Sequence, residues 1–229
     1  MAESLKINFE KPIALFPLPN CVLLPGATIP LHIFEARYRQ MASNALDSLG
    51  LISMALFEGD QWRYDYEGKP PIRSHVCVGY VVRHHRYGDG RYDLLLQGVC
   101  RAKVIREVEH DPYRKALLKP TETTQTMEID LLNERQRLET MLNDPLLSHL
   151  TTVSAVQNLL NREVPTPTLV DLAIMSVCED TEDRYSMLIE KQVLRRLSFL
   201  EQLLRQTRKT LEMAEHLRPP KTTDDISLN

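Results

Sequence analysis

Glycine and cysteine are scarce in this chain of 229 residues, and neither is spaced as a nucleotide or metal site requires. None of the eight glycines belongs to a GxxxxGK[ST] phosphate loop, which excludes the nucleotide site of a P-loop ATPase. The four cysteines contain no CxxC pair, so we expect free thiols in a reducing compartment and no disulfide framework. ATP hydrolysis is therefore not expected of this protein.

Long apolar runs and a strong net charge are also missing. No stretch approaches 18 uninterrupted apolar residues, so we expect no membrane-spanning helix and no membrane partner. Residues 1–6 lack the basic start and apolar middle of a secretory signal, which predicts a cytoplasmic location. A net charge of −3 gives no broad positive field, so nucleic acid is not the expected partner.

The side chains that could carry hydrolytic or metal chemistry are scattered along the chain. No GxSxG elbow is present, so a Ser-His-Asp hydrolase is not indicated. Zinc-site spacing is likewise absent among the candidate ligands, which are His32, His75, Cys77, His84, His85 and His110. We therefore expect no enzymatic activity, no catalytic residue, no cofactor and no metal.

A β-rich half, which we place at residues 8–120, comes first in the chain. Short runs of Val, Ile, Leu and Tyr between Pro and Gly residues predict a mostly antiparallel sheet. Its clearest part is a hairpin in which residues 79–87 and 91–96 flank Gly88-Asp89-Gly90, because this turn tolerates positive φ. One helix should begin near Ile33 or Phe34, end before Gly50, and pack on the sheet through Phe34, Tyr38, Met41 and Ala45.

A helical half, placed at residues 121–217, follows. No glycine occurs after Pro120 in the sequence, and Leu, Glu, Gln and Arg dominate. Helices are predicted at about 127–143, 145–161, 168–178 and 183–217, with Thr168 and Asp171 as a capping box and Asp180 with Asp183 as a second cap. The tail at residues 218–229 should be disordered.

The last predicted helix carries an apolar stripe with steps of four and three residues. Its members are Val193, Leu197, Leu200, Leu204 and Leu211. Packing inside the helical half accounts for such a stripe, and a coiled-coil homodimer seam is the alternative.

Residues 13–38 read IALFPLPNCVLLPGATIPLHIFEARY and closely resemble the opening signature of the Lon protease N-terminal (substrate-binding) domain family. Val78-Gly79, the block 89–104 and the block 111–116 also fit this family in order, although Ala102 stands where an aromatic is typical. The resemblance implies an α+β fold, with a PUA-like β-rich pseudo-barrel subdomain followed by a C-terminal α-helical bundle. It further implies a stand-alone member that lacks the ATPase and peptidase domains and recognises unfolded or tagged polypeptides.

Exposed apolar groups between the two halves are the expected contact surface for a protein partner, with pairing at a strand edge as a further mode. Large aromatic rings are common interface anchors, and residues 61–66 are rich in them. The candidate protein-binding residues are Leu18, Leu31, Trp62, Tyr64 and Tyr66. The alternative for the aromatics is that they cap the core.

A second set of residues is interpreted as fold-specifying. Proline stiffens strand ends, glycine permits turns, and an arginine paired with a carboxylate fixes a helix. These candidate structural residues are Pro25, Gly26, Glu35, Arg37, Asp89 and Gly90.

Two other functions stay open at the level of sequence. Arg83-His84-His85-Arg86 is the best positive patch, and PUA-like folds also occur in RNA-binding proteins, so an RNA-binding module is one alternative. A structural homodimer through the last helix is the other.

Overall fold

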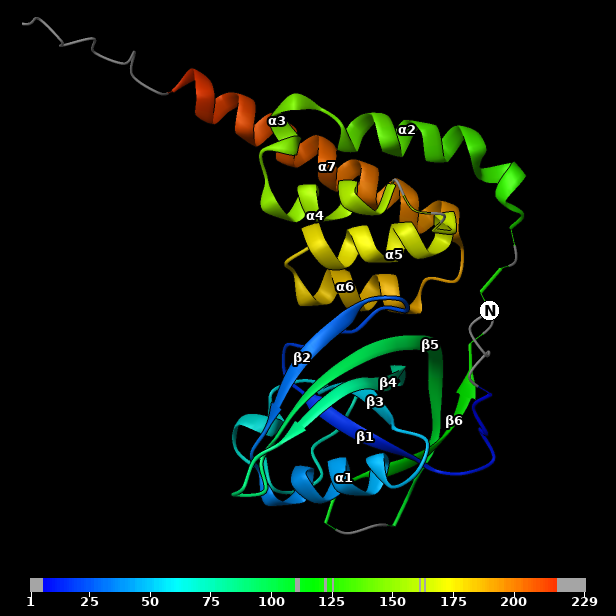
Figure 1. Cartoon of the computed structure of the whole chain (residues 1–229), viewed down its shortest axis with the longest axis vertical. Coiled ribbons are helices and arrows are strands. Elements are labelled where there is room, and N and C mark those ends of the chain that lie inside the picture. The colour runs from blue at the N-terminus through cyan, green and yellow to red at the C-terminus, as the bar shows by residue number, and fades with distance from the viewer. Residues whose placement is uncertain are drawn as a thin grey trace, which may run out of the picture.

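The structure is a computed structural model with an α+β fold, and it describes residues 6–109, 112–121, 123, 124, 126–160, 162 and 164–217. A sheet with one α-helix and one short 3-10 helix forms the first half of the chain, and the remaining helices form the second half (Figure 1). The last strand ends at Pro120 and the first helical turn after it begins at Glu128. The change from strands to helices, predicted near residue 120, therefore falls between these two residues. Residues 218–229, the predicted disordered tail, lie outside the described residues.

The described strands form one six-stranded sheet in the order β2-β5-β4-β3-β1-β6. β5 is long enough to pair with β2 and β4 first and with β6 later, so five strands close into a ring and β2 lies outside it. Only the β1–β3 pairing is parallel among the described strands, which confirms a mostly antiparallel sheet. The strands are β1 (Ile13–Leu18), β2 (Thr28–Ile33), β3 (Leu51–Leu56), β4 (His75–Arg86), β5 (Tyr92–Val108) and β6 (Lys115–Pro120).

The predicted hairpin is confirmed as the turn from β4 into β5. Arg86 pairs with Tyr92 at the end of the ladder, and the Gly90 amide donates to the Tyr87 carbonyl at 3.0 Å. Gly90 has a φ of +84°, a conformation that a side chain disfavours. The residue types at 88–90 therefore predicted this turn correctly.

Helix α1 (Ala36–Leu46) confirms the predicted helix but begins two or three residues later than expected. Tyr38, Met41 and Ala45 are buried against the sheet, as their spacing predicted. The prediction for Phe34 was wrong, because this residue precedes the helix and 61% of its surface is exposed. Strand β2 runs through Ile33 with alternate residues inward, so Phe34 follows a strand end and not a helical face.

The helical half contains more breaks than the sequence indicated. The predicted helix 127–143 is a 3-10 turn, η2 (Glu128–Leu131), followed by α2 (Leu132–Leu142). The predicted helix 145–161 is divided into α3 (Pro145–Ser148) and α4 (Thr151–Leu160). After α5 (Thr166–Val177), the long helix predicted at 183–217 is likewise divided into α6 (Thr181–Ile189) and α7 (Val193–His216). Asp180 does cap α6, since its carboxylate accepts a bond from the Asp183 amide at 2.8 Å.

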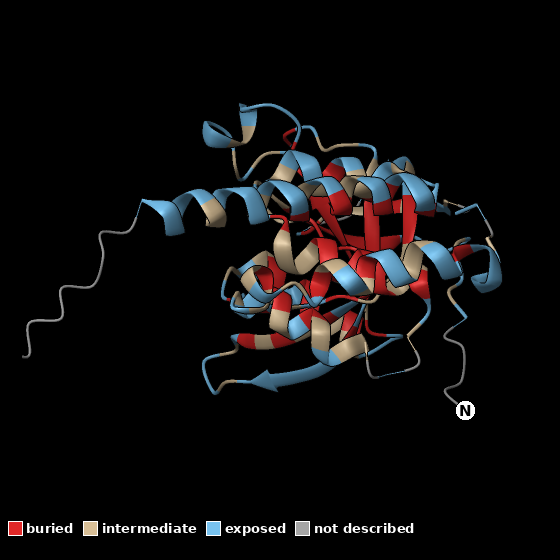
Figure 2. Cartoon of the chain, turned by 90° about the horizontal axis from the view of Figure 1, so that it is seen from above, coloured by how far each residue is buried: buried red, intermediate tan, exposed pale blue. Residues whose placement is uncertain are grey.

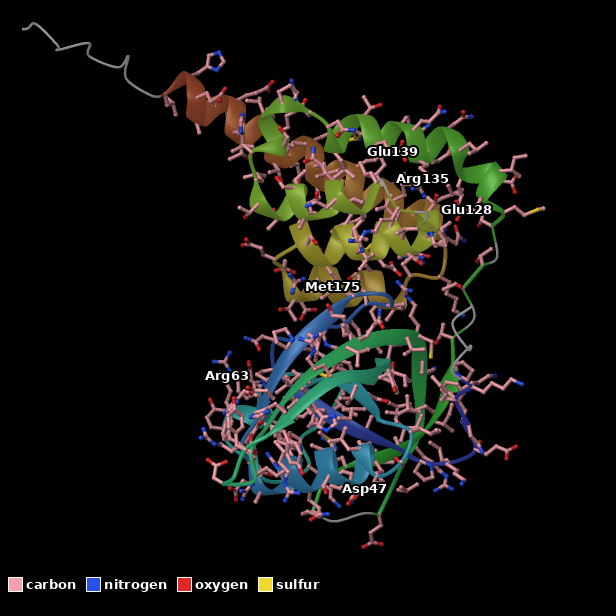
Figure 3. The ribbon with its side chains drawn as sticks, in the orientation of Figure 1. Asp47, Arg63, Glu128, Arg135, Glu139 and Met175 are labelled. Atoms are coloured by element: carbon pink, nitrogen blue, oxygen red, sulfur yellow. The ribbon has the colours of Figure 1, made fainter. Side chains whose placement is uncertain are left out.

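The predicted Thr168–Asp171 capping box is wrong. α5 begins two residues before Thr168, with Pro165 as its N-cap, and the carboxylate of Glu128 accepts bonds from the Thr166 amide at 2.8 Å and hydroxyl at 2.7 Å. Arg135 donates to the Val164 carbonyl beside them, and Figure 3 shows Glu128 on η2 and Arg135 in the first half of α2. The start of α5 is therefore fixed by a carboxylate 38 residues away in the chain.

The two halves share one core and are held together by buried charges. A single cluster of buried apolar side chains runs from Leu96 of the sheet to Leu169 and Leu200 of the helices, and buried residues fill the centre in Figure 2. Arg101 of β5 makes two hydrogen bonds of 2.8 Å to Asp171 of α5. On α7, Leu197, Leu200 and Leu204 of the predicted stripe lie in this core and Leu211 packs against it, which confirms the intramolecular interpretation for these residues.

Candidate protein-binding surface

The surface is built around the loop between β3 and β4, which carries the short helix η1 (Gln61–Arg63). Phe57 at the start of the loop is buried, and the ring of Trp62 stacks on it with a centroid distance of 6.1 Å. Tyr66 meets the same ring edge-on at 5.9 Å. Trp62 and Tyr66 thus cover the core at Phe57 with part of their surface, while Tyr64 is 90% exposed.

Arg37 of α1 clamps this loop to the body of the protein. Its guanidinium donates to Glu35 Oε2 at 3.1 Å and to the Tyr66 carbonyl at 3.2 and 3.3 Å. The same group lies over the rings of Tyr38 at 4.7 Å and Tyr66 at 4.8 Å, and the Tyr66 hydroxyl donates to Glu35. Arg37 thus pairs with Glu35 and holds the loop, and the rings stacked on its guanidinium are those of Tyr38 and Tyr66 and not that of Phe34.

The charge state of Arg37 follows from these neighbours. Burial alone would lower the pKa of Arg37, but the nearby Tyr38 and Glu35 raise it overall. Burial, followed by the Glu35 carboxylate, raises the pKa of the Tyr66 hydroxyl. At neutral pH the Arg37 guanidinium is therefore charged and the Tyr66 hydroxyl is protonated, so both groups can donate the hydrogen bonds of the clamp.

The cavity under the loop is too small to be the ligand site. It has a volume of about 60 Å3 and is lined by Arg37, Tyr38, Phe57 and Tyr66 among others. That space is enough for only a few water molecules. Arg63 projects from the outer side of the loop (Figure 3).

Phe34 is an exposed aromatic that the sequence analysis did not select. It lies one residue before Glu35, and its ring stacks on His32 with a centroid distance of 6.1 Å and an angle of 27°. Counting the strand alternation of β2 through Ile33 would have found it, since the residue after a strand end need not point inward. The Glu35–Arg37 clamp joins the segment that carries Phe34 to the loop that carries Tyr64, because Arg37 bonds both to Glu35 and to the Tyr66 carbonyl.

The two leucines of the predicted surface are not exposed. Leu31 of β2 is a core residue with 8% of its surface accessible, and Leu18 at the end of β1 is half-buried and packs on the same core. A side chain inside a packed core cannot contact a ligand without local opening. We therefore leave both out of the surface.

The remaining predicted structural residues occupy two turns. Pro25 and Gly26 form a turn in which the Ala27 amide donates to the Leu24 carbonyl at 3.2 Å, and Gly26 has a φ of +84°, as a type II turn requires. The Asp89 carboxylate accepts from the Arg91 amide and guanidinium, which lowers the pKa of Asp89. Arg39 of α1 donates to the Asp89 carbonyl at 2.9 Å, so the hairpin tip is tied to the same helix as the aromatic loop.

The basic run at residues 83–86 does not form one patch. These residues pair in regular register with β5, so Arg83 and His85 point to one face of the sheet and His84 and Arg86 to the other. Within the described segments, no group of three or more His, Cys, Asp and Glu side chains is placed to hold a metal ion. The same segments contain no helix long and apolar enough to cross a bilayer.

The fold is that of Lon N-terminal domains. A Lon N-terminal domain protein from Xanthomonas campestris aligns with a TM-score of 0.57 at 23% identity, covering 83% of this chain and 96% of that chain. The N-terminal domain of the Mycobacterium avium complex Lon protease aligns with a TM-score of 0.63 at 16% identity, covering 85% and 98%.

The chain belongs to the family described as the ATP-dependent protease La (LON) substrate-binding domain, whose profile matches residues 12–206. It is 21% identical over 219 residues to Lon protease 2 of Myxococcus xanthus, covering 93% of this chain and 26% of that protein. It is 22% identical over 208 residues to the Lon protease of Anaeromyxobacter dehalogenans, covering 90% and 24%. The chain thus spans about a quarter of the length of these curated relatives.

Proposed function

We propose that this protein is a non-catalytic module that recognises unfolded or tagged polypeptide segments in the cytoplasm. The observation that carries the proposal is the pair of exposed aromatic side chains, Tyr64 and Phe34, whose segments are joined by the Glu35–Arg37 clamp. Membership of the substrate-binding domain family supports a polypeptide as the ligand. The ring of five strands supports the PUA-like description of the β-rich half.

The clamp gives the surface its physical advantage. A loop that must be ordered on binding loses conformational entropy, which weakens the complex. Here Arg37 and Glu35 already hold the loop through Tyr66, and Phe57 already fixes the ring of Trp62. Apolar side chains of an unfolded segment would therefore meet preorganised aromatic faces, which are effective anchors in interfaces.

Trp62 is the one tryptophan of the chain, so its fluorescence reports directly on this surface. We expect a reduced and alkylated unfolded protein that contains no tryptophan to change the Trp62 emission, whereas the same protein in its native state should not. Replacing Phe34→Ala and Tyr64→Ala together should weaken the binding about tenfold, as loss of interface anchors does.

Ile129→Ala is the matched control, because Ile129 is also apolar and 70% exposed but lies on η2 in the helical half. This variant should bind like the unchanged protein. Equal affinity for all three proteins, or no emission change at saturating unfolded ligand, would contradict the proposed surface.

A further inference from the structure

A second surface lies on the outer face of strands β2, β5 and β4, close to the hairpin tip. Register pairs His32 with Asp93 and Asp93 with His85, and it pairs Pro30 with Leu95 and Leu95 with Arg83. Two rows of three side chains therefore lie across one face of these strands. The end of β4 is exposed and is drawn in pale blue in Figure 2.

This face is hollowed into a groove. The hollow has a volume of about 570 Å3, which is within the range of ligand sites, and it is lined by residues from all three strands. Pro30 and Leu95 form an apolar row, and His32, Arg83 and His85 bring nitrogen-bearing side chains beside it. We name this surface the hairpin groove.

The hairpin groove has hydrogen-bond donors with free capacity. Asp93, the carboxylate on this face, is already occupied, since it accepts bonds from His32 Nδ1 at 2.6 Å and from the Tyr87 hydroxyl. Arg83 has no hydrogen bond or ion pair with any residue that the structure describes. A guanidinium carries five N–H donors and no acceptor, so a ligand here should supply negatively charged acceptors.

We propose that the hairpin groove binds an extended acidic polypeptide segment, with a carboxylate on Arg83 and an apolar side chain on Pro30 and Leu95. This proposal rests on the proposed function, which gives a polypeptide as the ligand. It adds that the bound segment is acidic and also carries an apolar side chain. Charge complementarity selects an acidic sequence, and the apolar row selects an apolar side chain two residues from the carboxylate, because residues i and i+2 of an extended segment point to the same face. A single unpaired arginine is too few for RNA, whose affinity rests on several neutralised phosphates.

The test uses the full chain and the fluorescein-labelled hexapeptide Asp-Ser-Leu-Ser-Asp-Ser, measured by anisotropy at low salt, because Asp and Leu then share one face of the extended peptide. Arg83→Gln should weaken binding about tenfold, because a charged hydrogen bond is lost. Arg86→Gln is the matched control, since Arg86 is on the same strand but on the opposite face, over the ring of Tyr92. It should change the affinity less than about twofold.

Two further arms complete the test. Leu95→Ser should also weaken peptide binding, and the matched hexapeptide Lys-Ser-Leu-Ser-Lys-Ser should not bind. The proposal is overturned if Arg83→Gln and Arg86→Gln behave alike, if the Lys peptide binds as well as the Asp peptide, or if labelled RNA binds through Arg83 where the Asp peptide does not. Failure of the groove would leave the unfolded-protein binding at Phe34 and Tyr64 unchanged, so the two proposals fail separately.

Discussion

At the scale of single residues, Asp93 shows how neighbouring hydrogen-bond donors change the pKa of a carboxyl group. The hydrogen bond from Tyr87, followed by that from His32, lowers the pKa of Asp93 below its ordinary value. The same bond raises the pKa of the Tyr87 hydroxyl. Both directions have one cause, because the bond requires a charged carboxylate and a protonated phenol. This hydrogen bond therefore stabilises the hairpin at pH values between the pKa of Asp93 and the pKa of Tyr87.

A pH dependence follows from these directions. Because the folded pKa of Asp93 is lowered, its contribution is present above the unfolded pKa of about 3.9 and is lost as pH falls through the folded value. The folded pKa of Tyr87 is raised, so the contribution of Tyr87 to stability is present below its unfolded pKa of about 10. It is lost as pH rises through the folded pKa. We expect Tyr87→Phe to destabilise the protein at pH 7 more than at pH 3, measured by urea unfolding. Tyr64→Phe should show no such difference, and a Tyr87→Phe effect independent of pH would refute the linkage.

At the scale of secondary-structure elements, Gly26 sets how closely the turn before β2 approaches α5. Its φ of +84° disfavours any side chain, and a Cβ built on it would lie 2.9 Å from Thr168 Cγ2. Thr168 thus packs against the turn, in the position where the sequence predicted a helix cap. The glycine of the opening signature serves both the turn and the contact between the halves.

Gly26→Ala should therefore lower the free energy of unfolding by about 2 kcal/mol through backbone strain and overpacking. Thr168→Ser removes the methyl group in the contact, so adding it should restore part of the loss and leave the part due to φ. Urea unfolding of both single variants and the double variant measures this coupling. The contact would be ruled out as a cause if Thr168→Ser restored nothing in the Gly26→Ala background.

At the scale of the whole molecule, two arginines and one aspartate hold the sheet against the helices. Arg101 comes from β5, Asp171 from α5 and Arg196 from α7, and all three side chains are buried. Arg196 Nε lies 3.0 Å from Asp171 Oδ1 without the alignment of a hydrogen bond. Arg101 also donates to the Leu188 carbonyl at 3.0 Å, so the cluster reaches α6. Removing the one carboxylate would leave two buried cations without a counter-charge.

Asp171→Asn should accordingly cost about 3–5 kcal/mol of stability. Glu182→Gln is the control, because Glu182 also pairs across the two halves, with Arg73 at 2.6 Å, but its side chain is 66% exposed. An exposed pair of this kind contributes at most about 1 kcal/mol, so the control should be nearly neutral. Thermal and urea unfolding compare the two variants, and similar losses would show that burial of the charges is not what matters.

The sequence alone determined the features that are local in the chain. The Gly88-Asp89-Gly90 hairpin, the β-rich half before the helical half and the Asp180 cap could be predicted, because turn chemistry, periodicity and capping act between near neighbours. The opening signature likewise indicated the family, which the profile match confirms.

Tertiary structure decided the rest. Asp171 has the spacing of a cap, yet it pairs with arginines 70 residues before it and 25 residues after it. The rings of Trp62 and Tyr66 pack on Phe57, whereas Tyr64 of the same loop is exposed. Burial and ion pairing depend on which distant segments meet in space, and no local pattern records that meeting.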